Sequence, residues 1–379
     1  MNDSKSDKTD TYPRPLVSIV MPVHNQQLVL RQTLESVCAQ SLHNFELVLV
    51  DDGSIDGSLA IEREFARRDS RIRLFPCTAK GAAPARNFGL DAVTGRYVIF
   101  LDSDDLFHPD LLLDMASVLE ATGADICICE ADFFFGDEGA TRPFYRFDSL
   151  KEGLYRRHAL EYATFQVGGG AAWNKMYRRR FLIDTRAFFQ DAKCYNDSFF
   201  VVKAMSEADS VYLLKRSLVL YRRGLGTSIQ DRRRAHPYEA IKVSETIINE
   251  VYDKGAFTDS ELASLGLACT SILVAAVGDL ITVNAYDERA HESIVAIFQR
   301  LGMTGTPPRP AEIGTILKAA LVQRATYQQV VWAHARWVQE TRAHTLMEKL
   351  DFALRIVIAI VLSNLPVGGK PLGSCARNT

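Results

Sequence analysis

The stretch that decides the fold is Val98-Ile99-Phe100-Leu101-Asp102-Ser103-Asp104-Asp105, in which four apolar residues run directly into three carboxylates separated by one serine. A short continuous apolar run predicts a strand that is covered on both faces of a sheet. Asp102 and Asp104 stand two positions apart, and such side chains on an extended chain point the same way. Two carboxylates so placed are suited to hold Mg²⁺ or Mn²⁺ together with a phosphate. The alternative is that Asp105 caps a helix beginning near Leu106, with the other two acids as solvated loop charges.

Two earlier segments have the same organisation, an apolar strand with a polar tip. Residues 17–25, Val-Ser-Ile-Val-Met-Pro-Val-His-Asn, indicate a strand stopped by proline, and residues 45–54 indicate another that ends in Asp-Asp-Gly-Ser. Helical patterns separate the strands, which predicts a mostly parallel α/β sheet with crossover helices. In open sheets of this kind, ligands bind outside the carboxyl ends of the strands. The polar residues expected to gather there are Asn25, Asp51, Asp52, Asp102 and Asp104.

Seven short motifs, in order and at sensible spacing, resemble those of the family-2 glycosyltransferases, which are inverting enzymes of the GT-A fold. The motifs are Pro22-Val23-His24-Asn25, Asp51-Asp52-Gly53-Ser54-x-Asp56-Gly57, Ala85-Arg86-Asn87-x-Gly89-Leu90, Gly95-Arg96-Tyr97, Leu101-Asp102-Ser103-Asp104-Asp105, Trp173-Asn174-Lys175 and Asn196-Asp197. Each is weakly specific alone, but seven in sequence are hard to obtain by chance. The resemblance implies a GT-A-like, mostly parallel central sheet flanked by helices, with a C-terminal helical region, of the bacterial polysaccharide-assembly type.

The resemblance also implies roles for the residues at the strand tips. Asp52 is the acid that contacts uracil, since a carboxylate accepts a hydrogen bond from a ring N–H. Asp104 is the ligand of Mn²⁺ or Mg²⁺, and Asp102 reaches the ribose. The other residues expected in the donor nucleotide pocket are Pro22, Val23, Asn25, Asp51 and Arg86. For Asp51 and Asp52, the Asp-Asp-Gly-Ser sequence also favours a turn by itself.

Sugar transfer also needs a base for the acceptor hydroxyl. By resemblance Asp197 is that base, and attack opposite the leaving group gives inversion at the anomeric carbon. Partial burial before Phe199 and Phe200 is expected to raise its pKa. The family commonly has two acids here, whereas this chain has Asn196 before Asp197. The alternative role of Asp197 is a plain helix N-cap.

Trp173 and Lys175 are candidates for contact with the acceptor or the donor. Tryptophan offers a flat face to a sugar ring and lysine a point charge to phosphate. Without the matched motif, Trp173 would be a core residue and Lys175 a surface residue. Gly168-Gly169-Gly170, just before them, indicates a turn or a close approach to a ligand. Tyr221-Arg222 and Ser228 resemble a family segment that closes over the donor.

Three regions are expected along the chain. Residues 1–14 are polar, which predicts a flexible tail rather than a signal peptide or a membrane anchor. Residues 15–235 form the predicted nucleotide-sugar glycosyltransferase domain. Residues 236–379 are mostly helical by pattern, with a linker at 304–310. Their apolar stretch 352–362 is too short to cross a bilayer, which predicts a buried terminal helix or, alternatively, an interfacial one.

Composition argues against several classes of function. The formal net charge is −2, with 44 basic and 46 acidic residues, whereas a general nucleic-acid binder is strongly basic. Seven cysteines without metal-type pairing predict free thiols in a reducing compartment. No Gly-x-Gly-x-x-Gly follows the first strand, which argues against a dinucleotide oxidoreductase. No membrane-spanning segment is predicted, which argues against processive synthesis coupled to export.

Basic residues concentrate in three runs, Arg178-Arg179-Arg180, Arg222-Arg223 and Arg232-Arg233-Arg234. These runs are typical of solvated turns and helix ends. The alternative is a basic rim that faces an anionic membrane surface or a lipid diphosphate.

The resemblance therefore predicts a metal-dependent, inverting hexosyltransferase. It would move a sugar from a UDP-sugar to a hydroxyl of a glycan or lipid-linked acceptor in cell-surface polysaccharide synthesis. The alternative is a catalytically inactive nucleotide-sugar-binding partner of an assembly complex. The expected location is the cytoplasm, including a peripheral position on the cytoplasmic face of the cell membrane, and no nucleic-acid partner is expected.

Overall fold

The computed structural model describes residues 14–77, 81–135, 139–147, 149–223, 233–283 and 285–301. The chain divides into two compact units. The first comprises Met1–Arg232 and Glu245–Ala268, and the second Arg233–Ser244 and Cys269–Thr379. The predicted linker at 304–310 and the apolar stretch at 352–362 lie outside the described residues.

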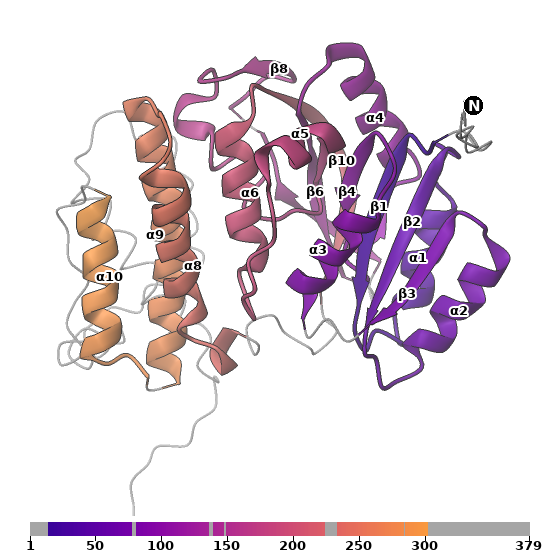
Figure 1. The fold of residues 1–379 in the computed structure, drawn as a ribbon, viewed down its shortest axis with the longest axis horizontal. Helices are drawn as coiled ribbons and strands as arrows, with labels where there is room; N and C mark the ends of the chain where they lie inside the picture. Colours follow the sequence, from indigo (N-terminus) through magenta and orange to yellow (C-terminus); the bar gives the residue numbers. More distant parts are fainter. Residues whose placement is uncertain are drawn as a thin grey trace, which may run out of the picture. The chain divides into compact units, whose positions relative to one another are not determined.

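The first unit is built on one ten-stranded mixed sheet (Figure 1). The strand order is β3-β2-β1-β4-β9-β6-β10-β5, with β7 added to β6 and β8 added to β10. The strands are β1 (Val17–Val23), β2 (Phe45–Asp52), β3 (Ile72–Cys77), β4 (Tyr97–Phe100), β5 (Leu106–Phe107), β6 (Ile126–Phe135), β7 (Ala140–Tyr145), β8 (Gly153–Arg156), β9 (Lys175–Arg178) and β10 (Ser210–Arg223). The neighbouring pairs β1–β2, β2–β3 and β1–β4 are parallel, and so is β6–β10. β9 runs antiparallel between β4 and β6. The prediction of a mostly parallel sheet flanked by helices is confirmed.

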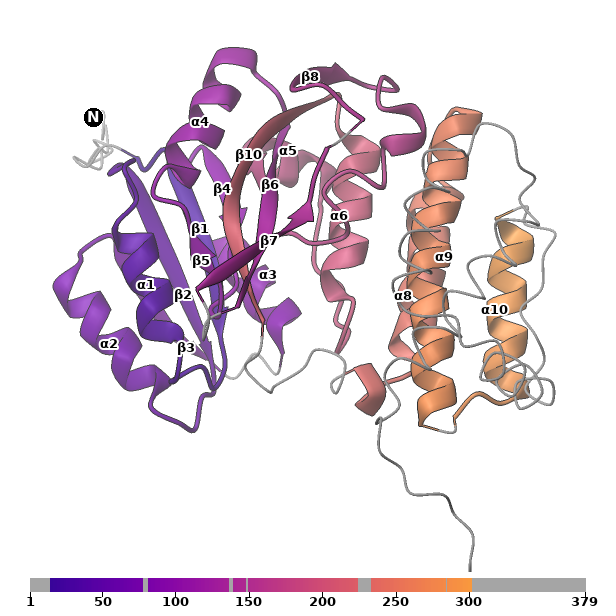
Figure 2. The same cartoon turned by 180° about the vertical axis from the view of Figure 1, so that it is seen from behind.

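Helices cover both faces of this sheet (Figures 1 and 2). One face carries α1 (Leu30–Cys38), α2 (Ser58–Arg68) and α4 (Leu111–Thr122), and the other carries α3 (Ala82–Ala92), α5 (Arg179–Thr185) and α6 (Asn196–Glu207). A short 3₁₀ turn at Glu161–Ala163 lies between β8 and β9 in the chain. The helices beyond β10 are α8 (Glu239–Ile247), the π-helical turn η2 (Ile248–Tyr252), α9 (Asp259–Thr282) and α10 (Glu288–Arg300). The predicted C-terminal helical region is therefore present among the described residues.

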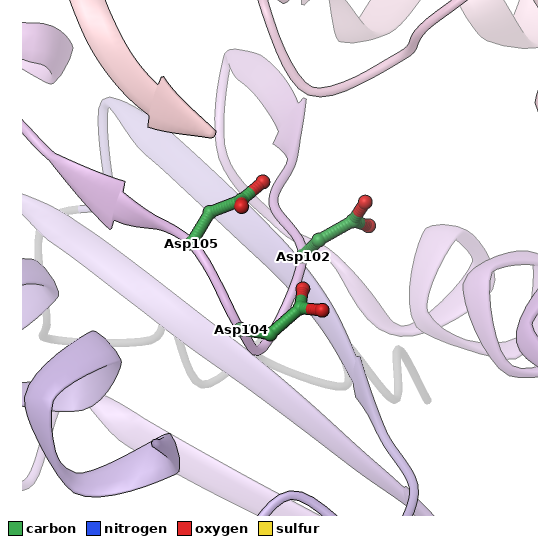
Figure 3. A group of neighbouring side chains, drawn as sticks. All are labelled: Asp102, Asp104 and Asp105. Atoms are coloured by element: carbon green, nitrogen blue, oxygen red, sulfur yellow. The ribbon is translucent and has the colours of Figure 1, made fainter. Parts of the chain in front are cut away.

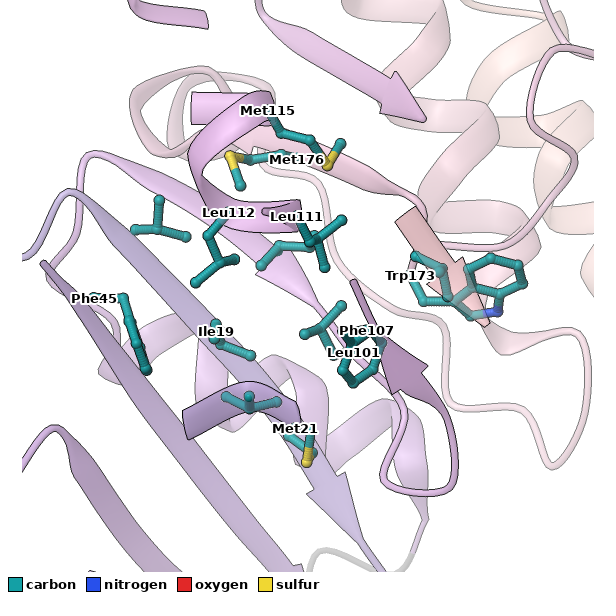
Figure 4. Packing of buried hydrophobic residues seen from close by; sticks show 14 of the residues in the cluster. Ile19, Met21, Phe45, Leu101, Phe107, Leu111, Leu112, Met115, Trp173 and Met176 are labelled. Carbon is teal, nitrogen blue, oxygen red and sulfur yellow. The ribbon is translucent and has the colours of Figure 1, made fainter. Parts of the chain in front are cut away.

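The larger core fills the face of the sheet under α1, α2 and α4. Alternate residues of β1, Ile19 and Met21 among them, point into it because side chains alternate along a strand. Leu111 and Met115 of α4 meet them from above, and Leu101 extends the core past the end of β4 (Figure 4). All five are at most 1% exposed, so their burial contributes strongly to stability.

The opposite face is packed mainly by aromatic rings. Phe100 of β4 makes edge-on contacts with Tyr177, Phe189 and Phe200. Gly89 lets α3 lie very close to β1 on this face, because a Cβ at that position would stand 2.4 Å from Val20 Cγ1. Close packing of this helix matters for the site, since α3 also carries Arg86.

Pro22 lies in the central strand β1, where proline is normally disfavoured because it has no N–H for the ladder. β1 pairs with β2 as far as Val23 and Asp51, but with β4 only from Val17 to Val20. Pro22 therefore lies beyond the last residue of β1 that β4 pairs. The strand order changes direction here, and ligands of open α/β sheets bind at such a point.

The second unit is described only by its helical segments. Its helix α10 begins at an N-cap, Asp287, whose side chain accepts a hydrogen bond from the backbone N–H of Ala290. Arg233 and Asp279 form an ion pair at 3.2 Å. None of the six cysteines in the described part of the chain forms a disulfide: these are Cys38, Cys77, Cys127, Cys129, Cys194 and Cys269.

One helical segment in the described part, Asp259–Val277, is long and apolar enough to cross a membrane by length and composition. About half of that window, 53%, is buried within the protein. Core helices of globular proteins pass the same test, so the segment carries no assignment to a membrane.

Candidate active site

Three carboxylates gather where β4 ends, in the turn that leads to β5 (Figure 3). One oxygen each of Asp102, Asp104 and Asp105 lies within 4.8 Å of the others. Asp105 is fully buried, and its Oδ1 accepts a hydrogen bond from the backbone N–H of Arg222 at 2.8 Å. Its Oδ2 is buried without a hydrogen-bond partner. Burial, followed by the charges of Asp104 and Asp102, raises the pKa of the Asp105 carboxyl well above its usual range.

This acid cluster fits a hard divalent cation. Oxygen ligands from several carboxylates are what Mg²⁺ and Mn²⁺ prefer. A buried carboxylate oxygen without a donor calls for a ligand, since buried polar atoms are normally satisfied. Asp104, the predicted metal ligand, is partly exposed beside Asp105 and so lies on the open side of the cluster.

The expectation that Asp105 caps a helix is wrong. The helix α4 begins five residues after Leu106, at Leu111, and its N-cap position is Asp110. Leu106 and Phe107 instead pair with Leu220 and Val219 of β10 as the short strand β5. The apolar run after Asp105 was too short to distinguish a strand from a helix by its pattern.

Arg86 connects this cluster to the helix that carries the predicted base. It is 7% exposed and reaches from α3, where Nη2 donates to Asp102 Oδ1 at 2.6 Å. Its Nη1 donates to Asn196 Oδ1 at 3.1 Å, and its guanidinium lies 5.3 Å from the ring centroid of Phe189. One side chain therefore fixes the tip of β4 relative to the start of α6.

Asp197, the predicted base, lies in the first turn of α6. Its residue is partly buried, and burial raises the pKa of its carboxyl. The nearby Arg86 charge acts in the opposite direction, and the charge of Asp102 raises the pKa further. The N-cap position belongs to Tyr195, which has a left-handed backbone with φ 58° and no side-chain capping bond. Asp197 is therefore not the N-cap.

The loops that follow β1 and β2 are bonded to each other. Asn25, with φ 53°, donates its backbone N–H to Ser54 Oγ at 3.1 Å, and its Oδ1 accepts from the N–H of Ile55 at 2.9 Å. His24 Nδ1 donates to the carbonyl oxygen of Asp52 at 2.9 Å. Asp52 Oδ2 accepts from the backbone N–H of Gly81, at the start of α3, at 2.6 Å. The tips that were expected to line a nucleotide pocket thus form one bonded rim.

Asp51 and Asp52 point to opposite faces of β2, as alternate strand residues do. Asp51 is 2% exposed and accepts the N–H of Ser54 at 3.3 Å, which is the turn contact that the sequence also favoured. Glu62 of α2 is fully buried, and neither of its carboxyl oxygens has a hydrogen-bond partner. Burial, then the charges of Asp51 and Asp56 and the close approach of the Asp51 side chain, raise the pKa of Glu62 to about 8, and the charge of Arg63 acts in the opposite direction.

Lys175 and Trp173 both lie inside the protein. The ammonium of Lys175, which is 0% exposed, donates to the carbonyl oxygens of Gly168, Gly169 and Ala171 and to Asn174 Oδ1, at 2.7 to 3.0 Å. The glycines make a turn around it, with φ 67° at Gly168 and 63° at Gly169. Burial lowers the pKa of Lys175 to about 7, and the charge of Asp197 acts in the opposite direction.

These positions narrow the predicted roles of the two residues. With four acceptors around its ammonium, Lys175 supports the glycine turn and does not present its charge to a phosphate. Trp173 is 5% exposed and stacks on Tyr221 at 5.5 Å, with 11° between the ring planes. Its ring therefore backs another aromatic side chain instead of offering an open face.

Arg222 holds the acid cluster in place, a role that the sequence did not predict. Besides its backbone bond to Asp105, its Nε donates to the carbonyl oxygen of Asp104 at 2.7 Å and its Nη2 to Gln32 Oε1 at 3.0 Å. The Tyr221-Arg222 pair resembled a family segment, but nothing local indicates a partner 117 residues away. Ser228, from the same segment, lies outside the described residues.

Several arginines of the three basic runs are engaged within their own unit. Arg178 donates to the carbonyl oxygen of Ala124 at 3.0 Å, and Arg180 pairs with Asp184 at 2.8 Å, one turn away on α5. These contacts agree with the expectation of turns and helix ends for the first run.

The family model of glycosyl transferase family 2 matches residues 18–186. The N-terminal region of this chain belongs to glycosyl transferase family 2. Among its relatives, EpsH of Bacillus subtilis is 33% identical over 225 residues, which cover 57% of this chain and 63% of EpsH. The glycosyltransferase GlyA of Streptococcus pneumoniae is 32% identical over 212 residues, covering 54% of this chain and 30% of GlyA. The chain thus spans less than two thirds of the length of each of these relatives.

A solved structure supports the fold of this chain. Residues 1–349 of TarS from S. aureus superpose with a TM-score of 0.52 at 16% identity, covering 93% of both chains. At this identity the likeness concerns the fold alone. The predicted family and the GT-A-like fold are both confirmed.

Proposed function

We propose that this family-2 chain is an inverting, metal-dependent glycosyltransferase that moves a sugar from a UDP-sugar to a hydroxyl of a glycan or lipid-linked acceptor. The observation that carries the proposal is the link through Arg86. This one side chain bonds Asp102 of the acid cluster and Asn196, the residue before Asp197. Groups suited to a leaving diphosphate and a group suited to the incoming hydroxyl are thereby held together.

On the donor side, the rim formed by Asn25, Asp52 and Gly81 supports binding of the nucleoside. Asp104, with Asp102 and Asp105, would hold Mn²⁺ or Mg²⁺. When bound, such a cation neutralises charge on the leaving diphosphate. Asp102 accepts from Arg86, so its carboxylate is oriented before any ligand arrives.

On the acceptor side, Asp197 takes the proton of the attacking hydroxyl. Its raised pKa brings the carboxyl closer to the working pH, which is what general-base catalysis favours. The Arg86 charge opposes that rise and so favours the ionised carboxylate, which is the form that accepts a proton. Attack from the side opposite the leaving group inverts the anomeric carbon.

The setting proposed for this reaction is cell-surface polysaccharide synthesis on the cytoplasmic side, with residues 1–14 as a tail, 15–235 as the catalytic domain and 236–379 as a helical, membrane-peripheral region. The naming of GlyA as a glycosyltransferase supports the reaction class. The family resemblance supports the setting.

The test is a screen of UDP-, GDP- and CDP-sugars for binding and slow hydrolysis, with and without Mn²⁺ or Mg²⁺. We expect UDP to bind in a metal-dependent way and UDP-sugars to release UDP. Asp104→Asn should weaken metal-dependent binding by about tenfold or more, because it removes a charged ligand. The matched control is Asp91→Asn, which changes an exposed aspartate of α3.

The outcomes separate the proposal from its alternative. Binding of a UDP-sugar without release of UDP, even with acceptor extracts, would favour the inactive binding partner. Absence of binding by every nucleotide would contradict both functions. Equal binding with and without metal would remove the cation from the proposal.

A further inference from the structure

Aromatic side chains from three strands form a continuous layer on one side of the sheet, next to the proposed active site. We call it the aromatic shelf, and its rings are Phe133, Phe135, Phe144, Tyr145 and Tyr221. All five residues are partly exposed. The shelf forms because β7 and β10 both pair with β6, and because an irregularity in the pairing of β6 with β7 at Phe144 lets the consecutive rings of Phe144 and Tyr145 stack.

The rings of the shelf are stacked and backed by the core. Phe144 lies 4.0 Å from Phe133 and 4.1 Å from Tyr145, centroid to centroid, with ring planes within about 24°. The buried ring of Trp173 lies parallel to Tyr221 beneath the layer. Partly exposed, preorganised aromatic surface of this kind marks a binding site more often than a chance patch.

One end of the shelf faces the acids of the site. Burial, with the charge of Asp197, raises the pKa of Tyr145 to about 12. Burial, with the charges of Asp105 and Asp102, raises that of Tyr221 as well. Both tyrosines therefore lie within electrostatic range of the carboxylates to which the proposed function assigns the transfer.

Two exposed arginines lie over rings of the shelf, and one of them, Arg223, also lies 5.9 Å from the ring centroid of Tyr221. The guanidinium of Arg142 lies 5.3 Å from the ring centroid of Phe135, and that of Arg223 lies 5.4 Å from Phe133. The two rings are themselves 6.3 Å apart, so the two charges lie over neighbouring rings. Among the described residues neither arginine forms an ion pair, whereas the adjacent Arg146 is paired with Asp132.

We propose that the aromatic shelf binds the acceptor as a saccharide that carries a phosphate, with sugar rings on the aromatic faces and the phosphate on Arg142 and Arg223. The proposal rests on the proposed function and adds the chemical class of the acceptor. A guanidinium held over a ring keeps its N–H edges available, and arginine edges match phosphate oxygens in pairs. The two uncompensated positive charges complement the charge of one phosphate.

The test uses the whole protein with excess UDP and Mn²⁺, so that the donor site is filled. Glucose 1-phosphate, galactose 1-phosphate and N-acetylglucosamine 1-phosphate are titrated by ligand-observed NMR and compared with their parent sugars and with inorganic phosphate. We expect at least one sugar phosphate to bind about tenfold more tightly than its parent sugar. The double variant Arg142→Gln, Arg223→Gln should abolish that difference.

The matched control is Arg96→Gln. Arg96 is also an exposed arginine over an aromatic ring, 5.6 Å from Tyr97, but it pairs with Glu120 away from the shelf. We expect its variant to bind as the parent protein does. A second variant, Phe135→Leu, should weaken the parent sugars and sugar phosphates alike, since it removes a ring and keeps both arginines.

Three outcomes overturn the shelf proposal: no sugar phosphate binds better than its parent sugar, the double variant keeps the difference, or inorganic phosphate binds as tightly as the sugar phosphates. UDP binding to the same samples distinguishes the two proposals. If UDP binds normally and the sugar phosphates show no preference, the shelf proposal alone fails. If UDP does not bind, the proposed function fails whatever the shelf does.

Discussion

The two sides of the candidate site are built in different ways. The donor side consists of strand tips β1, β2 and β4, whose acids follow directly on apolar runs and bond to residues of adjacent loops. The proposed acceptor side consists of Asp197 on α6 together with β6, β7 and β10, whose rings and arginines come together through pairing across the sheet. One side of this site can therefore be predicted from local sequence motifs, whereas the other side depends on packing between distant segments.

The largest expected effect tests whether the two sides meet in one reaction. Asp197→Asn should lower the rate of sugar transfer by about a thousandfold, within the range for loss of a general base, and leave UDP binding nearly unchanged. The measurement is product formation alongside UDP titration. Asp184→Asn, at an exposed aspartate of α5 paired with Arg180, is the matched control. Unchanged transfer in Asp197→Asn would remove the base assignment.

The next effect concerns the bridge between the sides. Arg86→Met should leave Asp102 without its guanidinium partner and detach Asn196. We expect transfer to fall by about ten- to a hundredfold and the free energy of unfolding by about 2–4 kcal/mol, as for a broken buried ion pair. Rates and urea unfolding curves check both. A stable variant with full activity would show that the bridge does not position the reacting groups.

A third change tests the support beneath the acceptor side. Lys175→Met removes the ammonium donor from the carbonyl oxygens of Gly168, Gly169 and Ala171, of which Gly168 keeps the Asn174 amide as a donor, and this should lower the free energy of unfolding by about 2 kcal/mol or more. Lys254→Met, at an exposed lysine paired with Glu250, should change it by less than about 0.5 kcal/mol. If Lys175 instead touched phosphate, binding would fall while stability stayed constant.

The last effect is confined to the region of Asp51 and depends on pH. The folded-state pKa of Glu62 is about 8, against an ordinary value of 4.5, so the folded protein holds a proton that the unfolded chain releases. The stabilisation is complete below about pH 4.5 and declines by about 1.4 kcal/mol per pH unit up to about pH 8. Glu62→Gln should remove this decline between pH 5 and 8.

The control for this pH effect is on the same helix. Glu64 is partly exposed and paired with Arg31 and Arg68, so Glu64→Gln should keep the decline. Urea unfolding at several pH values measures all three proteins. Parallel curves for the parent protein and Glu62→Gln would show that Glu62 is ionised in the folded protein.

The donor side could be predicted because its chemistry is local. Strand tips such as Asp51-Asp52 and Asp102-Ser103-Asp104 follow apolar runs, and parallel strands bring their carboxyl ends to one edge of the sheet. The turn contact of Asp51 with Ser54 was also predicted by the Asp-Asp-Gly-Ser sequence. What the pattern did not give was the face to which each acid points.

The acceptor side could not be predicted to the same depth. Trp173 and Lys175 were marked by a motif, but a motif does not state burial, and both lie inside the protein. On the donor side, the alternative of a helix cap at Asp105 failed for the same reason, because its bond to Arg222 spans 117 residues. Register shifts in the pairing of β6 with β7 and β10 decide which rings share a side, and these are set by tertiary packing.

The glycine at position 89 has a consequence for the chemistry although it touches no acid. Its missing side chain lets α3 settle on Val20, and Arg86 projects from the same helix three residues earlier. A methyl group at 89 would lift the helix and carry the guanidinium away from Asp102. The distance between α3 and β1 at Gly89 and Val20 thus decides whether the Arg86 guanidinium reaches Asp102. In this way the close packing of a helix on its sheet sets the position of a charged group in the proposed site.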